Sequence, residues 1–213
     1  MKIILPSSAA VIAVALLATA TVAAPDIKDT SFRDADGQRV QQLQLTVDVA
    51  PSKVWLAFTT DAGLQSWVAP VVHVTTGNDG IMEASYLPTS KIGDPDNIRN
   101  RIIAYIPDHL LVFHNEHAPK NGPFKQDMIT KIRTIVELQD LGDGRTRIIE
   151  SGVGYGEGTD FDTMYEHFRS GNAEEFKALA GALAGHPIDW KAEQAQVQAS
   201  VKRPFATPEK PTH

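Results

Sequence analysis

The stretch His114 to His117, His-Asn-Glu-His, is the densest group of side chains that could bind a metal ion or transfer protons. Neighbouring side chains of a strand point to opposite faces, so His114 and Glu116 could converge while His117 begins a loop. His73 could supply a third metal ligand. The group lacks the spacing of zinc proteases, in which two histidines lie one helical turn apart. We therefore interpret these residues as solvated loop positions and expect no bound metal.

Glu150 is the second candidate for chemistry. Strand alternation places it on the same side as Ile148, on the expected concave face of a sheet. A buried carboxyl group either pairs with a base, such as Arg101, or has a raised pKa. The ion pair is the commoner arrangement and the one we expect. If the protein is an enzyme, Glu150, His114 or Tyr165 would be its general acid or base.

A glycine-rich segment, Gly152 to Gly158, superficially resembles a phosphate-binding loop. Its glycines occur at every second position, however, and not at the G-x-G-x-x-G spacing of dinucleotide-binding loops. We interpret the segment as a flexible turn into the next helix. The sequence also contains no nucleophile elbow, Walker loop or metalloprotease signature, so we expect no cofactor.

The residues before these candidates predict a strand followed by two short helices. Apolar and polar residues alternate from Val40 to Val49, as in a half-buried strand. Pro51 then suits the first turn of a helix, and Thr60 lies where its hydroxyl could cap a second one. Trp67 could face either the core or a ligand. The apolar residues that we expect in the core are Val54, Trp55, Phe58 and Leu64.

A run of strands follows, and each contains β-branched or aromatic residues bounded by turn signals. Asp143-Gly144 separates the last two strands and is typical of a hairpin, because this turn needs positive φ angles. The predicted strands are 71–76, 80–86, 99–106, 110–115, 128–138 and 145–151.

The C-terminal third has helical periodicity. Apolar residues from Thr159 to Ala184 form one face of a long helix. Ser170-Gly171-Asn172 lies in its middle, and we expect a kink or break there. Asp189 to Val201 predicts a further polar helix, and the prolines at positions 204, 208 and 211 indicate a disordered tail.

The first residues have the order of a secretory signal peptide. Lys2 precedes an apolar run from Ala9 to Leu17, and cleavage is plausible after Ala20 or Ala23. The alternative, an uncleaved anchor, would need about 20 apolar residues to cross a bilayer. We expect a signal peptide over 1–23, a linker over 24–39, one domain over 40–186, and a polar helix and tail over 187–213. The protein would then be periplasmic or secreted, with no integral membrane segment after cleavage.

Composition narrows the possible partners. The chain has no cysteine, so disulfides, thiolate metal sites and cysteine nucleophiles are excluded. Its formal net charge is −6 and it has no long basic run, which argues against nucleic acid as a partner. Hydrophobic residues make up 42% of the chain, enough for a core without disulfides.

Three stretches carry a resemblance to a known family: VDVAPSKVWLAFTTDAGLQSWVAP from Val47 to Pro70, LGDGRTRIIESG from Leu141 to Gly152, and EHFRSGNAEEFKALAGAL from Glu166 to Leu183. The sequence resembles the START-like superfamily, also called SRPBCC, and within it the homologues of the activator of the heat-shock-chaperone ATPase. The resemblance implies an α+β helix-grip fold, in which a curved antiparallel sheet wraps around a long C-terminal helix and leaves a cavity. The two short helices would close one end of that cavity.

The sequence departs from this family at one position in the last helix. Many relatives have a Gly-Trp pair there, whereas Gly171 is followed here by Asn172. Either the cavity is enlarged and wetted at this point, or another residue fills the gap.

The resemblance implies three possible functions. The first is an exported, non-catalytic protein that binds a small hydrophobic or amphipathic molecule between sheet and helix. The second is a cyclase-like or hydrolase-like enzyme, and the third is a protein-binding module. The loops 87–97 and 117–127 are candidate lids. From strand and helix parity, the expected ligand-binding residues are Tyr86, Phe113, Ile132, Thr134, Glu150, Met164, Tyr165 and Phe168.

Overall fold

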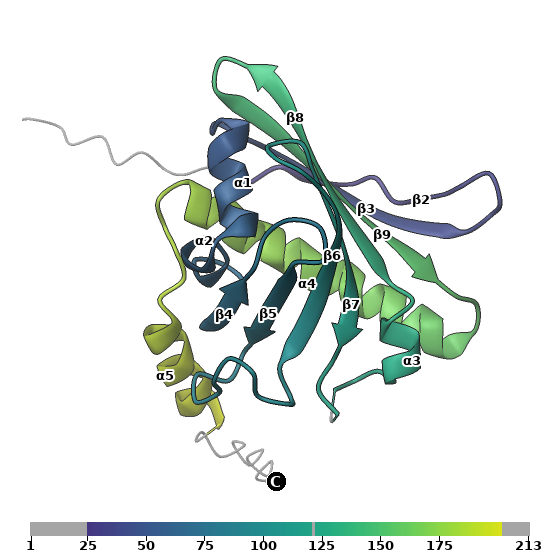
Figure 1. Cartoon of the computed structure of the whole chain (residues 1–213), viewed down its shortest axis with the longest axis vertical. Helices are drawn as coiled ribbons and strands as arrows, with labels where there is room; N and C mark the ends of the chain where they lie inside the picture. The colour runs from purple at the N-terminus through teal and green to yellow at the C-terminus, as the bar shows by residue number, and fades with distance from the viewer. Residues whose placement is uncertain (1–24, 121, 202–213) are drawn as a thin grey trace, which may run out of the picture.

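The structure, a computed structural model, describes residues 25–120 and 122–201 and shows a curved sheet lying across one long helix (Figure 1). The signal peptide and the proline-rich tail that we predicted lie outside the described residues. No helix within the described ranges combines the length and the hydropathy that a membrane crossing requires.

The sheet has nine antiparallel strands in the order β1-β3-β9-β8-β7-β6-β5-β4, and β2 also pairs with β3. The helix-grip fold that the sequence predicted is therefore confirmed. The strands are β1 (Ile27–Asp29), β2 (Phe32–Arg33), β3 (Arg39–Val47), β4 (Val71–Val74), β5 (Ile81–Ser85), β6 (Ile98–Ile106), β7 (Leu110–His117), β8 (Arg133–Gly142) and β9 (Arg145–Tyr155). The helices are α1 (Pro51–Thr59), α2 (Asp61–Gln65), α3 (Gln126–Ile129), α4 (Thr159–Leu183) and α5 (Trp190–Val201).

The corner between α1 and α2 follows the prediction. Pro51 begins α1, and the Thr60 hydroxyl accepts a 3.0 Å hydrogen bond from the Gly63 amide at the start of α2. The Trp67 indole lies edge-on to Phe58, with 5.2 Å between ring centroids, and donates to the Ala57 carbonyl. These contacts fix α1 and α2 relative to each other.

The first strands correct the prediction of a linker. Ile27–Asp29 and Phe32–Arg33 lie within the linker predicted over 24–39, but they form β1 and β2, which pair with β3. The strands are only three and two residues long, too short to show a periodic pattern in the sequence.

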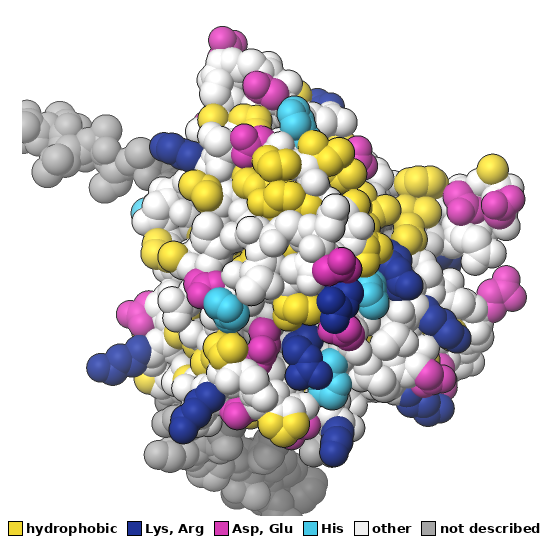
Figure 2. All heavy atoms as spheres, viewed as in Figure 1, with side chains coloured by type: hydrophobic (Ala, Val, Ile, Leu, Met, Phe, Trp, Pro, Cys, Tyr) yellow, Lys and Arg dark blue, Asp and Glu magenta, His cyan; other side chains and the backbone are white. Residues whose placement is uncertain are grey.

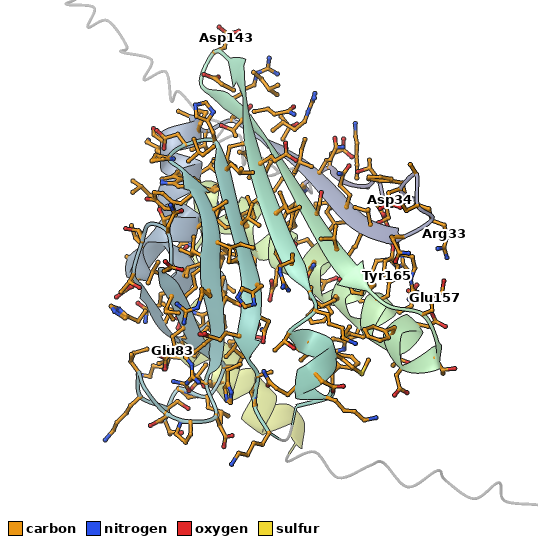
Figure 3. The ribbon with its side chains drawn as sticks, turned by 45° about the vertical axis from the view of Figure 1, so that its right-hand side comes forward. Arg33, Asp34, Glu83, Asp143, Glu157 and Tyr165 are labelled. Atoms are coloured by element: carbon orange, nitrogen blue, oxygen red, sulfur yellow. The ribbon has the colours of Figure 1, made fainter. Side chains whose placement is uncertain are left out.

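The strand predicted over 128–138 is also partly wrong. Met128 and Ile129 are both buried on the short helix α3, and β8 begins only at Arg133. Two consecutive buried side chains do not fit an alternating strand with one solvent face. From Arg133 onward the predicted alternation holds, and Figure 3 shows Asp143 at the far tip of the β8–β9 hairpin.

The glycine-rich segment also differs from the prediction, because β9 continues through its first half to Tyr155. Gly154 has φ +94°, and a side chain there would collide with the backbone carbonyl of Lys131. Glycine is thus required at this position by close packing, and only the residues from Gly156 onward form the turn into α4.

Helix α4 runs from Thr159 to Leu183 without the expected break at Ser170-Gly171-Asn172. A single glycine costs a helix only about 1 kcal/mol relative to alanine, which the packed flanking turns can offset. Phe176 and Leu179 of α4 are fully buried in the main core, together with Leu45 of β3 and Ile148 of β9. Met164, nearer the start of α4, belongs to a second cluster with Tyr155.

Candidate functional site

A pocket of about 530 Å³ lies between the middle of α4 and the concave face of the sheet. Its wall comes from β5 to β9, from α1 and α2, from α3 and the loop before it, and from α4. Pockets that bind small molecules typically have volumes of about 300–1,000 Å³. Large apolar side chains in the wall include Phe58, Trp67, Met82, Phe113, Phe124, Ile132 and Phe168.

Most of the residues predicted to contact a ligand line this pocket: Tyr86, Phe113, Ile132, Thr134, Glu150 and Phe168. Trp67, for which we left core and ligand contact open, is 5% exposed and packed in the core, and it also lines the pocket. Strand parity thus identified the concave face correctly.

Met164 and Tyr165 were predicted at the same site, but the structure places both outside the wall. Met164 is completely buried in the second cluster. Tyr165 packs edge-on against Tyr155, with 5.0 Å between ring centroids, and the Arg39 guanidinium lies 5.1 Å from its ring centroid. Figure 3 shows Tyr165 beside Glu157, well separated from Glu83. In this first part of α4, Met164 and Tyr165 pack against Tyr155 of β9 and do not face the pocket.

Glu150 faces the pocket without the ion pair that we expected. Arg101 instead donates to Glu116, with 2.6 Å between Nη2 and Oε1. Within the described part of the chain, Glu150 has neither a hydrogen-bond donor nor a salt-bridge partner. Burial, together with the nearby charge of Glu175, raises the pKa of Glu150 from 4.5 to about 8.

Glu175 of α4 was not predicted, although it is central to the pocket. Burial raises the pKa of its carboxyl, while a hydrogen bond from Tyr86 acts in the opposite direction. The Tyr86 hydroxyl donates to Glu175 Oε1 at 3.0 Å. The exposed fraction of Tyr86 is 55%, so this side chain spans the pocket mouth with its hydroxyl directed inward. Helical spacing could have revealed Glu175, which lies seven residues after Phe168 on the same face.

Asn172 lies where many relatives have a tryptophan, and its contacts show what takes the place of that side chain. It lines the pocket and donates a hydrogen bond to the Gln41 side-chain oxygen at 3.2 Å. Gln41 Oε1 also accepts from the Tyr155 hydroxyl at 2.9 Å. A polar network therefore occupies the place of a large apolar side chain, and the pocket remains open beside it.

The histidines of the predicted metal cluster lie apart from this site. Glu116 pairs with Arg101, while His117 contacts the Pro95 carbonyl at 2.7 Å. His73 contacts Asp61 at 3.0 Å, near α2. His114 follows the pocket residue Phe113, so it faces the outer side of the sheet. Figure 2 shows charged and histidine side chains gathered over this outer face, in front of β6 and β7. Across residues 25–120 and 122–201, no three metal-ligating side chains come together.

Comparison with known proteins supports the fold. No family model matches the chain, and no curated protein matches its sequence. The Aha1 dimer structure from Colwellia psychrerythraea is 18% identical, with a TM-score of 0.50 over 68% of this chain and 95% of that one. CalU16 from Micromonospora echinospora is 14% identical, with a TM-score of 0.52 over 84% and 96%. MLL2253 from Mesorhizobium loti is 16% identical, with a TM-score of 0.52 over 70% and 100%.

At these identities the similarity concerns the fold alone. The chain has the START-like helix-grip fold that the sequence resemblance implied. Its pocket lies where the sheet curves around α4.

Proposed function

We propose that this protein binds and carries a small hydrophobic or amphipathic molecule in the pocket between α4 and the sheet. The observation that supports this most directly is an apolar-walled pocket of about 530 Å³ in an otherwise well-packed fold. Protein interiors normally contain few voids larger than a water molecule. Such a space, with a few polar groups in its wall, is typical of a ligand site.

Carriage is favoured over catalysis because the polar groups of the wall are not arranged as a reacting set. General acid–base chemistry needs a titrating group within hydrogen-bond reach of an oriented partner or substrate. Among the described residues Glu150 has no such partner, while His114 and Tyr165 lie outside the pocket. The raised pKa of Glu150 keeps a proton-transferring enzyme as the second candidate, because such shifts gather at active sites.

We further propose that the protein acts in the periplasm or after secretion. The signal-peptide features of residues 1–23 support this. N-terminal sequencing of the natural protein would give Thr21 as the first residue if cleavage follows Ala20, and Ala24 if it follows Ala23. A natural protein that starts at Met1 would contradict export by this route.

Native mass spectrometry of the protein purified from its own cell envelope tests the proposed function. A reproducible extra mass that disappears on denaturation is the expected result. Asn172→Trp, which should fill part of the pocket, is expected to abolish this mass. Thr134→Phe fills the wall from β8 and serves as a second variant if the first fails to fold. Thr46→Phe, at an exposed position of β3, is the matched control and should retain the ligand.

The proposal fails if the natural protein carries no extra mass and no apolar probe binds it. It also fails if the two pocket-filling variants retain the ligand as well as the Thr46→Phe control does. Turnover of a bound compound that disappears in Glu150→Gln would favour the enzyme instead.

A further inference from the structure

The pocket wall is acidic, and His167 is the only side chain among its described residues that could carry a positive charge. Its ionisable carboxyl groups are Glu83, Glu150 and Glu175, and no lysine or arginine of the described residues lines it. Glu83 is already satisfied, because its Oε1 accepts from the Gly93 amide at 2.6 Å and from the Asn97 side chain at 2.5 Å. Glu150 and Glu175 therefore remain as two neighbouring carboxyls that face an apolar space.

Two carboxylates in such a space are costly unless a positive charge lies close to them. The described part of the wall contains no lysine or arginine, only His167, and a ligand in the pocket could supply a permanent positive charge. The aromatic side chains around the pair, among them Phe113 and Phe168, can also contact a cation through their ring faces.

We propose that the ligand has a protonated amine at one end of an apolar body and that Glu150 and Glu175 hold this amine between them. The inference rests on the proposed function and specifies the class of ligand. Tyr86 would orient the pair, since its hydroxyl already donates to Glu175 Oε1 at the pocket mouth.

Binding of an amine in this pocket should release a proton to solvent, which can be measured. With its pKa at about 8, Glu150 is mostly protonated at pH 7 in the empty protein. An ammonium group binds the carboxylate form, so the Glu150 proton must leave for solvent as the amine enters.

The other titrating groups in the wall are Glu83 and Tyr86 from β5 and the residues after it, Tyr155 from β9, and His167 and Glu175 from α4. His167→Gln is the variant that separates any histidine contribution from that of Glu150.

Isothermal titration calorimetry with decylamine, decanol and decanoate tests the proposal, because these probes share one chain length and differ in the head group. At pH 7, decylamine should bind at least about tenfold more tightly than decanol, as a charge-assisted hydrogen bond allows. Titrations in phosphate and in Tris should differ in apparent enthalpy in the way that release of about one proton requires. Decanol should show no such difference, and decanoate should bind most weakly.

Matched variants test whether the preference for decylamine depends on Glu150 and Glu175. The double variant Glu150→Gln and Glu175→Gln should lose the preference for decylamine and the proton release, while its affinity for decanol stays within about twofold of the wild-type value. Glu174→Gln is the control, because Glu174 neighbours Glu175 on α4 but is exposed and pairs with Lys177 at 2.6 Å. It should behave as the wild type, which excludes attraction of the amine to the acidic surface in general.

The two proposals fail in different ways. Equal binding of the three probes, or a preference for decanoate, would overturn the amine proposal and leave a ligand pocket. A preference for decylamine that survives the double variant would also overturn it. Failure of all three probes to bind would contradict the pocket as a ligand site, and the amine proposal with it.

Discussion

Two neighbouring stretches of α4 face the same sheet with opposite results. Phe176 and Leu179 are completely buried in the main core, together with residues of β3 and β9. Gly171 and Asn172, about one turn earlier, and Glu175, directly before Phe176, line a pocket. The backbone is continuous helix through both stretches, so the difference comes from side-chain volume and polarity.

The comparison separates the residues that stabilise the fold from those that prepare a site. Large apolar side chains fill the packed end and supply most of the stability gained there. Small and carboxylic side chains in the middle of α4 leave space and introduce uncompensated groups, which reduces stability. Functional sites commonly carry such a cost.

The largest expected effect contrasts two phenylalanines of α4. Phe176→Ala removes a fully buried ring from the packed end and should reduce the free energy of unfolding by about 3–5 kcal/mol. Phe168→Ala should cost less than half as much, because one side of that ring already borders the pocket. Urea denaturation of both variants measures the difference. Equal losses would mean that the two ends are packed alike.

The second effect is the dependence of stability on pH. The pKa of Glu150 is about 8 when folded and near 4.5 as an ordinary carboxyl, so the folded state binds this proton more tightly. Stability is therefore highest below about pH 4.5 for this group and falls as pH rises toward 8. The expected loss between pH 5 and pH 8 is about 3 kcal/mol. Glu175 contributes in the same direction.

Glu150→Gln sharpens this test, because glutamine keeps the shape and cannot titrate. Its free energy of unfolding, measured by urea denaturation at several pH values, should change much less between pH 5 and pH 8. The exposed Glu174→Gln variant should keep the full wild-type slope. A wild-type protein that becomes more stable over this range would show that Glu150 is charged and paired when folded.

The smallest effect contrasts two helical glycines, Gly171 of α4 and Gly63 of α2. A Cβ added at Gly171 would meet no atom within 4 Å, and the residue lies inside a helix. Gly171→Ala should therefore raise the free energy of unfolding by about 0.5–1 kcal/mol. Gly63→Ala should lower it, because its Cβ would collide with the Leu56 carbonyl oxygen. Differential scanning calorimetry of the two variants compares them directly, and opposite shifts of the melting temperature are expected.

Local patterns predicted the elements that have a period or a capping signal. The stripe of Val54, Trp55 and Phe58 predicted α1, and strand alternation placed Thr134 and Glu150 on the concave face. These features depend on a few consecutive residues, so they can be read from the sequence. The short strands β1 and β2 and the four-residue helix α3 have too few residues for such a signal.

The missed parts of the site depend on contacts between distant residues. Arg101 alternates with the pocket residue Asn100 and so faces the outer side of the sheet, away from Glu150. The approach of Glu175 to Glu150 is decided by how α4 crosses the sheet, which no local pattern specifies. The same crossing buries Met164 and leaves Gly171 beside open space. Parity gives the face on which a residue lies, and the tertiary packing decides whether that face is filled.

Tyr86 bears on the rate at which a ligand could enter and leave the pocket. Its hydroxyl is hydrogen-bonded to Glu175 at the pocket mouth, so a molecule that passes beside this side chain would require the bond to open. The bond would then contribute to the residence time of the ligand as well as to its affinity. Tyr86→Phe should raise the dissociation rate more than the association rate in stopped-flow experiments, because it removes both the bond at the mouth and the hydrogen bond that orients Glu175. A carrier built this way would release its ligand at a rate controlled by one phenol.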